Sequence, residues 1–315
     1  MDKSLIVETS AGKVAGTEVD GVRQWLGVPY AHAERFAAPG PAEPWKGVRA
    51  AKRFAPQCPQ IFGSNPKRAQ VGERFTERGC LALNIWAPAS DPEPGRLRPV
   101  FFWIHGGAFC AGGSNIYRGA ELARSGDIIV VGINYRLGVL GFVDFGGALD
   151  EPEIPSNLGL RDQIAALEWV RDNIAGFGGD PRKVTIAGES AGSISVSLLM
   201  VCRRAWPLFR GAIMQSGALT LIRGQDKAQE LARSYLGLLG LGRREGLAGL
   251  RRLDVRTLLE AQAGIDGRQS ANVPAVPWFD GDLLPASLDE ALEHPHAEVP
   301  LIAGATREEV RLFEV

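Results

Sequence analysis

This 315-residue chain has few cysteines and almost no net charge. Its four cysteines form no Cys-x-x-Cys pair, which excludes a disulfide-built scaffold and the common zinc and redox motifs. Lysine and arginine number 35 against 36 acidic residues, which excludes recognition of nucleic acid or an anionic membrane by bulk charge. No run approaches the roughly 18 apolar residues of a membrane span, and residues 1–8 contain acids where a secretory signal has an apolar run. We therefore expect a cytoplasmic protein with no nucleic-acid or membrane partner.

Short apolar runs follow one another through the first 133 residues. Four β-like runs broken by glycine and proline are typical of antiparallel strands. They are residues 5–7, 13–19, 22–26 and 81–86. Continuous apolar runs at 100–104 and 128–133 instead favour strands buried on both faces, as in a parallel sheet.

Helix-like segments alternate with strands in the rest of the chain. Ser156 and Asn157 offer an N-cap to a helix that ends near Gly176. Further strands are predicted at 183–187, 211–214 and 299–303, and further helices at 193–202, 226–240 and 246–262. The alternation predicts an α/β fold with a doubly wound, mostly parallel sheet and antiparallel strands at its N-terminal edge. No repeat or linker divides the chain, so we expect a single domain over residues 1–315.

Residues 188–192 read Gly-Glu-Ser-Ala-Gly and fit the pattern Gly-x-Ser-x-Gly. A predicted strand ends just before them and an apolar helix follows, which is the setting in which this pattern carries a nucleophilic serine, here Ser190. We expect so sharp a turn that side chains beside Ser190 would meet the helix, which favours glycine on both sides. The positive end of the helix would favour negative charge near the hydroxyl. The alternative is a glycine-rich loop with an incidental serine.

Residues 105–109 read His-Gly-Gly-Ala-Phe and follow directly on the buried run 100–104. Acyl transfer needs N–H donors aimed at the carbonyl oxygen as it becomes an oxyanion, and small residues let backbone N–H groups come close to a substrate. We expect these donors from Gly107 and Ala108, with the N–H of Ala191 as the third. The alternative is a glycine-rich turn with no further role.

Beyond these two features, four further segments resemble the type B carboxylesterase family, the α/β hydrolases that include cholinesterases and bacterial para-nitrobenzyl esterases. They are residues 25–31, 134–138, 157–163 and 177–181. The likeness covers almost the whole chain. It implies the α/β-hydrolase fold, a small-molecule ester substrate, an acyl-enzyme on Ser190, and no metal or organic cofactor. It also implies that Phe109 lines the acyl pocket and that Glu189 shapes the alcohol side or the deacylating water.

The resemblance also implies an acid for the catalytic group. The family's acid lies in a Gly-x-x-x-(Asp/Glu)-Glu segment, and residues 304–309 match it so that Glu309 takes this role. Glu308 is the neighbouring candidate. Because Glu309 comes just beyond the last predicted strand, it would stand at the sheet edge where Ser190 also lies.

The chain departs from the family pattern in its N-terminal part. Residues 77–80 read Glu-Arg-Gly-Cys where the family has Ser-Glu-Asp-Cys. The family's acid that pairs with the arginine matching Arg35 is therefore replaced by a cation. We expect this ion pair only if Glu77 substitutes for that acid. Cys58 and Cys80 match a pair that is bridged in secreted relatives. A bridge would stabilise the fold by roughly 3 kcal/mol, but a cytoplasmic protein is expected to hold free thiols.

A general base is the element that the sequence does not supply. This fold uses the chain order serine, acid, histidine, and no histidine follows the acid here. His105 is expected to buttress the glycine-rich loop, and His32 to lie at the surface. His294 and His296 precede the last predicted strand, whose length would hold them roughly 15 Å from the active edge. We therefore expect the chain to be the N-terminal three-fifths of a longer enzyme.

The sequence thus predicts a serine carboxylic-ester hydrolase whose activity in the given chain is low. Loss of one member of a catalytic triad costs on the order of 10⁴ to 10⁶ in rate. The alternatives are a non-catalytic, cholinesterase-like binding protein and an enzyme of the same fold that acts on amides or carbamates. The sequence does not identify the ester, and it leaves the oligomeric state open, with a monomer as the expectation.

Overall fold

The computed structural model describes residues 5–91, 93, 95–266, 275–293, 295–309 and 311. Its strands are β1 (Ile6–Thr9), β2 (Gly12–Ala15), β3 (Thr17–Val19), β4 (Val22–Pro29), β5 (Ala31–His32), β6 (Gly40–Pro41), β7 (Val48–Ala50), β8 (Ala82–Pro88), β9 (Arg98–Ile104), β10 (Ile129–Ile133), β11 (Gly179–Glu189), β12 (Gly211–Gln215) and β13 (Leu301–Gly304). Its α-helices are α1 (Ala120–Gly126), α2 (Gly138–Gly141), α3 (Phe145–Leu149), α4 (Leu158–Asn173), α5 (Ala191–Val201), α6 (Gln225–Leu239), α7 (Gly246–Arg252), α8 (Val255–Asp266) and α9 (Leu288–Glu293).

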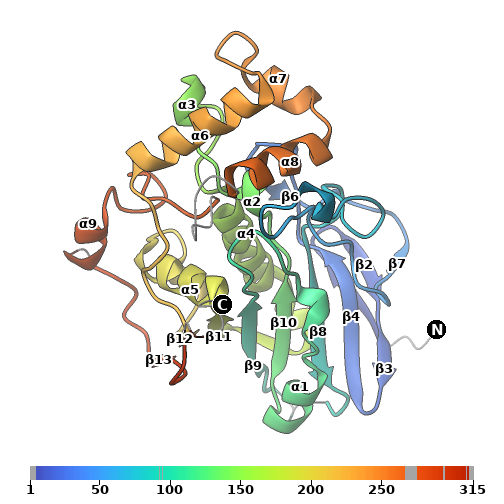
Figure 1. Cartoon of the computed structure of the whole chain (residues 1–315). Coiled ribbons are helices and arrows are strands. Elements are labelled where there is room, and N and C mark those ends of the chain that lie inside the picture. Colours follow the sequence, from blue (N-terminus) through green and yellow to red (C-terminus); the bar gives the residue numbers. More distant parts are fainter. Residues whose placement is uncertain are drawn as a thin grey trace.

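The main sheet has the strand order β13-β12-β11-β9-β10-β8-β4-β3, and Figure 1 shows its strands side by side. Every neighbouring pair from β10 through β9, β11 and β12 to β13 is parallel. β8 joins this part antiparallel to β10, and β4 and β3 continue antiparallel to the edge. The predicted parallel sheet with antiparallel strands at its N-terminal edge is therefore confirmed.

The carboxyl ends of the parallel strands are level with one another. Gly188 pairs with Ile104, Glu189 with Gln215, and Gln215 with Gly304. Because parallel strands all point the same way, the residues that follow β9, β11, β12 and β13 meet at one edge of the sheet. This edge is where the predicted site residues lie.

One N-terminal run that we predicted as an edge strand of the main sheet, and half of another, belong to a separate small sheet instead. β1 pairs antiparallel with β2, and β2 pairs parallel with β7. The predicted strand 13–19 is divided at Gly16, whose N–H donates to the Leu5 carbonyl oxygen at 3.0 Å. Only the second half, β3, reaches the main sheet by pairing with β4.

The predicted helix 246–262 is in fact two helices, α7 and α8. Leu253, between them, has an extended backbone with φ −67° and ψ 145°. The side chain of Asp254 then accepts a hydrogen bond from the N–H of Arg256 at 2.8 Å. A local bond from side chain to backbone thus competes with the helix where the sequence pattern runs on.

Asn157 stands at the predicted N-cap position of α4, but its side chain does not cap the helix. Its Nδ2 donates instead to the carbonyl oxygen of Trp278 at 2.9 Å and to the carboxylate of Asp280 at 2.7 Å. The expected local cap is therefore replaced by a bond to a distant segment.

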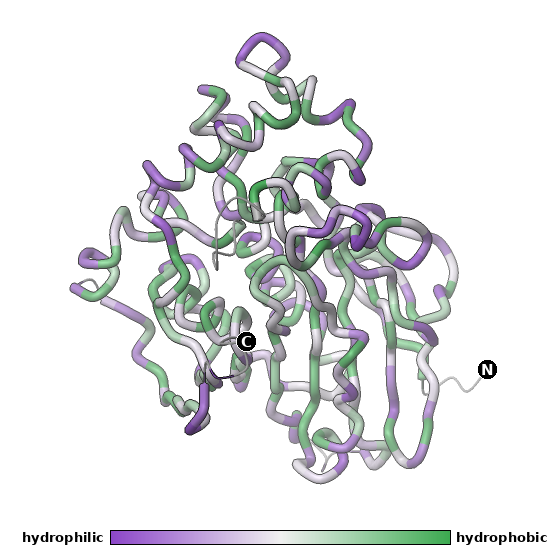
Figure 2. Tube along the Cα trace, in the orientation of Figure 1, coloured by the Kyte–Doolittle hydropathy of each residue, from purple (hydrophilic) through white to green (hydrophobic). Residues whose placement is uncertain are grey.

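The main sheet is covered on both faces, as a doubly wound sheet requires. Val100, Phe102 and Ile104 on one face of β9 belong to the larger core cluster, which includes residues of α4 and α5. Phe101, on the other face, packs with residues of α1 in a smaller cluster. Figure 2 shows hydrophobic colour along the central strands, and Figure 1 shows α6, α7 and α8 grouped beyond one end of the sheet. Within the part of the chain that the structure describes, no helix is both long and apolar enough to cross a membrane.

The two N-terminal departures from the family pattern have clear outcomes. Glu77 does substitute as the partner of Arg35, and its carboxylate accepts hydrogen bonds from Nε at 2.7 Å and from Nη2. Cys58 and Cys80 are buried free thiols with their Sγ atoms 2.8 Å apart. Burial and the neighbouring thiol raise the pKa of Cys58, which favours the protonated thiol.

Candidate active site

Ser190 forms the turn between β11 and α5. Its backbone has φ 56° and ψ −122°, in the region that residues other than glycine rarely adopt. The Ser190 N–H donates to the carbonyl oxygen of Gln215 at 2.9 Å, and its carbonyl oxygen accepts the N–H of Ile194 at 3.0 Å. The predicted sharp strand-turn-helix is therefore confirmed, and both neighbouring elements hold the strained residue in place.

Glycine on both sides of Ser190 is required by close backbone contact. A Cβ atom at Gly188 would lie 2.3 Å from the carbonyl carbon of Gly192. A Cβ atom at Gly192 would lie 2.0 Å from the carbonyl oxygen of Ile104 at the end of β9. Neither contact can be relieved by rotating a side chain, because the atoms in the way belong to the backbone. The predicted clash with the helix is confirmed for Gly188, whereas Gly192 must be glycine because of its contact with the end of β9.

The glycine-rich loop after β9 has an unusual backbone. Gly107, Ala108 and Phe109 have φ values of 111°, 54° and 59°, all in the left-handed region. The N–H groups of Cys110 and Ala111 both donate to the Gly107 carbonyl oxygen at 3.0 Å, which closes the turn. No acceptor for the N–H of Gly107 or Ala108 is found among the described residues. These two N–H groups are therefore available to a ligand.

The glycine-rich loop is in contact with the turn at Ser190. A Cβ atom at Gly106 would lie 2.6 Å from the carbonyl oxygen of Glu189 and 3.1 Å from the Cβ of Ser190. Ala191, the first residue of α5, carries one of the helix N-terminal N–H groups that have no partner within the helix. The structure thus brings together the serine and the segments that carry the predicted N–H donors.

Glu309 follows β13 and is held in its ionised form by two hydrogen-bond donors. The Thr306 N–H donates to Oε1 of Glu309 at 2.9 Å. Hydrogen bonds from the Ser216 side chain and from Thr306 lower the pKa of Glu309 below its ordinary value. Glu308 instead pairs with Arg311 at 2.7 Å. Of the two neighbouring acids, only Glu309 is therefore linked to the strand end beside Ser190.

Glu189 lies among groups that oppose its ionisation. Burial and repulsion from the Glu309 carboxylate raise the pKa of Glu189. Burial and the Glu189 carboxylate in turn raise the pKa of Tyr117, which hydrogen-bonds to the backbone of Gly106. Glu189, next to Ser190, is therefore close enough to interact with both Glu309 and Tyr117.

Sequence reasoning missed two of these neighbours, Ser216 and Tyr117. Ser216 follows β12 directly, as Ser190 follows β11, and its N–H donates to the Gly304 carbonyl oxygen at 2.8 Å. Its place just after a parallel strand was a signal that could have identified it. Tyr117 offered no such signal, since its position depends on how the loop after β9 folds back.

Phe109 is fully buried rather than exposed to a cleft. Its ring centroid lies 5.0 Å from that of Phe142, in an edge-to-face contact. Its carbonyl oxygen accepts the N–H of Gly138 at 2.7 Å. Phe109 thus supports the glycine-rich loop from behind, and its role in an acyl pocket stays a prediction.

Among the described residues, no hydrogen bond joins a histidine to Ser190 or to Glu309. His105 is buried, and its Nδ1 donates to the Gly106 carbonyl oxygen at 2.8 Å. Burial lowers the pKa of His105 to about 4, so the ring is neutral. His32 lies at the surface 3.4 Å from Glu34. His294 lies outside the described residues.

His296 lies at the opposite end of α5 from Ser190. The N–H of its neighbour Ala297 donates to the carbonyl oxygen of Met200 at 2.8 Å, near the last turn of this helix. A helix of eleven residues is about 16 Å long. This agrees with the separation that we expected from the sequence.

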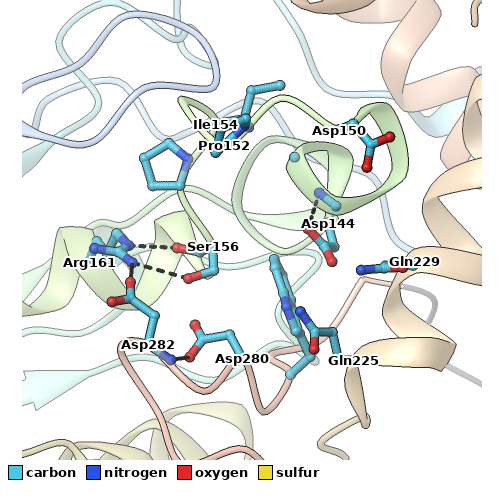
Figure 3. A pocket seen from close by; sticks show the side chains of 14 residues that line it. Asp144, Asp150, Pro152, Ile154, Ser156, Arg161, Gln225, Gln229, Asp280 and Asp282 are labelled. Carbon is cyan, nitrogen blue, oxygen red and sulfur yellow. Dashed lines mark hydrogen bonds and ion pairs between the residues drawn. The ribbon is translucent and has the colours of Figure 1, made fainter. Parts of the chain in front are cut away.

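A cavity of about 660 Å³ lies elsewhere, near α3 and α6, and Figure 3 shows the side chains that line it. Several of its polar groups are already bonded to one another. Arg161 pairs with Asp282 at 2.7 Å and bonds to Ser156, and Asp144 accepts the N–H of Gly147. No nucleophile faces a base there, so the chemistry favours the Ser190 edge as the candidate site. Among the described residues, no three or more His, Cys, Asp or Glu side chains gather as metal ligands would.

Comparison with known proteins assigns the chain to a family. The model of the carboxylesterase family matches residues 3–315. Para-nitrobenzyl esterase of Bacillus subtilis (strain 168) is 38% identical over 318 residues, covering 98% of this chain and 63% of that protein. Carboxylesterase 1C of Rattus norvegicus is 37% identical over 327 residues, covering 96% of this chain and 58% of its own length.

Solved structures agree with this assignment. A PNB esterase superposes with a TM-score of 0.88 at 38% identity, covering 99% of this chain and 66% of that one. Carboxylesterase EST55 of Geobacillus stearothermophilus gives 0.85 at 39% identity, covering 98% and 63%. The chain thus spans less than two thirds of the length of these relatives. It belongs to the carboxylesterase family and has the α/β-hydrolase fold.

Proposed function

We propose that this chain carries the nucleophile, the acid and the oxyanion donors of a serine carboxylesterase. The Ser190 hydroxyl attacks the carbonyl carbon of a carboxylic ester, the alcohol leaves, and water then releases the acid from the acyl-enzyme. The observation that carries the proposal is the close approach of the strained turn and the glycine-rich loop, which leaves no room for a Cβ atom at Gly106 beside Glu189 and Ser190. Membership in the carboxylesterase family supports the same chemistry.

The N–H groups of Gly107, Ala108 and Ala191 act as the oxyanion donors in this proposal. The first two have no acceptor among the described residues, and the third begins α5. Preorganised N–H donors are worth the most where charge develops, because they need no reorganisation during the reaction. The start of α5 adds its positive partial charge at the same place.

The acid in this proposal is Glu309, and the proton acceptor is a histidine other than the four in this sequence. The lowered pKa of Glu309 keeps it ionised at neutral pH, as an acid that orients an imidazolium must be. A histidine between Glu309 and Ser190 would take the hydroxyl proton and return it to the leaving alcohol. Without it, we expect the given chain to act as an esterase only weakly.

Two further roles belong to the proposal. Glu189 shapes the alcohol side or positions the deacylating water, which its place beside Ser190 supports. Phe109 forms part of the acyl side through the loop that it supports. We also propose that the substrate is a small-molecule ester, that residues 1–315 form one domain, and that the protein is a cytoplasmic monomer.

Labelling with a fluorophosphonate tests the nucleophile. The protein is incubated with the probe for an extended time, and peptide mass spectrometry locates the phosphonylated residue. We expect Ser190 to be modified, and Ser190→Ala to abolish the label. Ser197→Ala is the matched control, because that hydroxyl is buried and bonded to the Ile194 carbonyl oxygen. Label distributed over surface serines, unchanged in Ser190→Ala, would refute the proposed nucleophile and favour the non-catalytic binding protein.

Turnover of para-nitrophenyl acetate tests the missing proton acceptor. We expect kcat/KM of the 315-residue chain to be about 10⁴ or more below that of a complete relative such as para-nitrobenzyl esterase. A chain that matched the relative would show that the described residues already contain the base. Comparison with the corresponding amide decides between an esterase and the alternative acting on amides.

A further inference from the structure

The segment that follows β10 lies beside the glycine-rich loop. Ile133, the last residue of β10, pairs with Ile104, the last residue of β9. The next residues along each strand, Asn134 and Tyr135 on one side and His105 on the other, therefore leave the sheet together. All three are buried, with 2% or less of their surface exposed.

Tyr135 holds the first end of the loop. Its hydroxyl donates to the carbonyl oxygen of His105 at 2.9 Å. Its ring also stacks on the imidazole of His105, with centroids 4.4 Å apart and planes 22° apart. His105 in turn donates to the carbonyl oxygen of Gly106, where an added Cβ atom would meet Ser190.

Asn134 holds the other end of the loop. Its Oδ1 accepts hydrogen bonds from the N–H of Ser114 at 2.8 Å and from the Ser114 hydroxyl at 2.9 Å. Its Nδ2 donates to the carbonyl oxygen of Pro56 at 3.2 Å. Two consecutive side chains of one segment thus hold the two ends of the loop 105–114.

This segment is itself firmly anchored. Arg136 makes a two-pronged ion pair with the fully buried carboxylate of Asp162, with both N–O distances below 3 Å. The Tyr30 hydroxyl donates to the carbonyl oxygen of Asn134 at 2.7 Å. A segment fixed from both sides can impose its position on the loop.

The interior of the loop lies outside any helix or strand. Gly107, Ala108 and Phe109 have left-handed backbones, and no strand partner or helix continues through them. We infer that Asn134 and Tyr135 are positioning residues that together clamp the loop 105–114 and so aim the N–H groups of Gly107 and Ala108 at a substrate oxygen. The clamp rests on the proposed function for its purpose, although its effect on the loop is measurable without turnover.

Two readouts test the clamp in Tyr135→Phe and Asn134→Ala. The first is hydrogen–deuterium exchange of residues 106–113, which we expect to become at least about tenfold faster. The second is fluorophosphonate labelling of Ser190, separated into reversible binding of the probe and bond formation. We expect bond formation to slow by about tenfold or more, because the donors are misplaced, with probe binding little changed.

Matched controls remove the same groups elsewhere. Tyr235→Phe alters another fully buried tyrosine, on α6. Asn173→Ala alters another buried asparagine whose side chain bonds to two backbone groups. We expect both controls to leave loop exchange and labelling within about twofold of the unmodified protein. If Asn134→Ala does not fold, Ser114→Ala removes the hydroxyl partner of the same bond and takes its place.

The outcomes separate the clamp from the proposed function. Loop exchange and labelling that are unchanged in both variants would overturn the clamp while leaving the nucleophile intact. If surface serines take the label while Ser190 of the unmodified protein takes none, the proposed nucleophile is refuted, and the exchange experiment then decides the clamp alone. Slower labelling with unchanged exchange would also overturn it, because the loop would not have moved.

Discussion

Ser190 and Glu309 each follow a parallel strand at the same edge of the sheet, but the chain around them is held in different ways. At Ser190, buried strands and two glycines leave gaps too small for one added carbon atom. At Glu309, every residue of the preceding β13 is exposed, and the carboxylate is held by bonds from Ser216 and Thr306.

This difference teaches which part of the site the fold itself builds. Backbone contacts at the turn allow a single geometry, because nothing there can move without moving a strand. The acid depends on side-chain bonds at an exposed edge, where interactions are weaker and local opening is easier. The backbone at Ser190 is therefore held in one position, whereas the carboxylate of Glu309 can change position more easily.

Gly192→Ala should give the largest effect. The added Cβ would meet the Ile104 carbonyl oxygen at 2.0 Å, and relieving such a clash costs on the order of 3 kcal/mol or more in free energy of unfolding. Urea denaturation measures this loss. Gly237→Ala on α6 is the control, since nothing lies within 4 Å of its Cβ and alanine favours a helix. Equal stability of the two variants would show that the turn is not sterically fixed.

Low pH should destabilise the folded protein through His105, which lies in the glycine-rich loop beside Ser190. Its pKa is about 4 in the folded protein against an ordinary 6.5, so the unfolded chain binds more protons between these values. Stability is then fully present above pH 6.5 and is lost as pH falls to about 4, by about 3 kcal/mol in total. Urea denaturation over this range measures the slope. His296→Gln, at an exposed position, should leave it unchanged, and a flat profile would contradict a buried neutral His105.

A matched pair of isoleucines compares β9, which ends beside the Ser190 turn, with β13, which precedes Glu309. Ile104→Val removes a methylene group from a fully buried site on β9 and should cost about 1 kcal/mol. Ile302→Val makes the same change on β13, where 67% of the residue surface is exposed, and should cost close to nothing. Comparable losses of free energy of unfolding would mean that β13 is covered in solution.

Glu309→Gln should give the smallest effect on stability and a specific effect on Glu189. Repulsion from Glu309 helps to raise the pKa of Glu189, so removing that charge should lower this pKa, while burial keeps it above its ordinary value. Carboxyl titration by NMR measures the change. Glu308→Gln is the control, because Glu308 pairs with Arg311 instead. An unchanged pKa of Glu189 would place the two acids too far apart to share a site.

Much of the fold followed from sequence because its signals were local. The apolar runs at 100–104 and 128–133 became β9 and β10, and the Gly-x-Ser-x-Gly pattern became the sharp turn. Prediction failed where a distant partner or a competing local bond intervened. β1 pairs with β2 in a small sheet and not with the main sheet. The side chain of Asp254 bonds to the N–H of Arg256, so that a second helix starts within a continuous helical pattern.

The residue pattern by itself determined the strained serine, the need for glycine beside it and the parallel sheet, because each depends on the size or polarity of neighbouring residues in the chain. Only the tertiary structure decided which acid joins Ser216, which tyrosine supports His105, and that Glu77 replaces the lost partner of Arg35. These pairs join residues far apart in sequence. No local pattern records such a contact, because only the folding of the loops and strand ends brings the two partners within bonding distance.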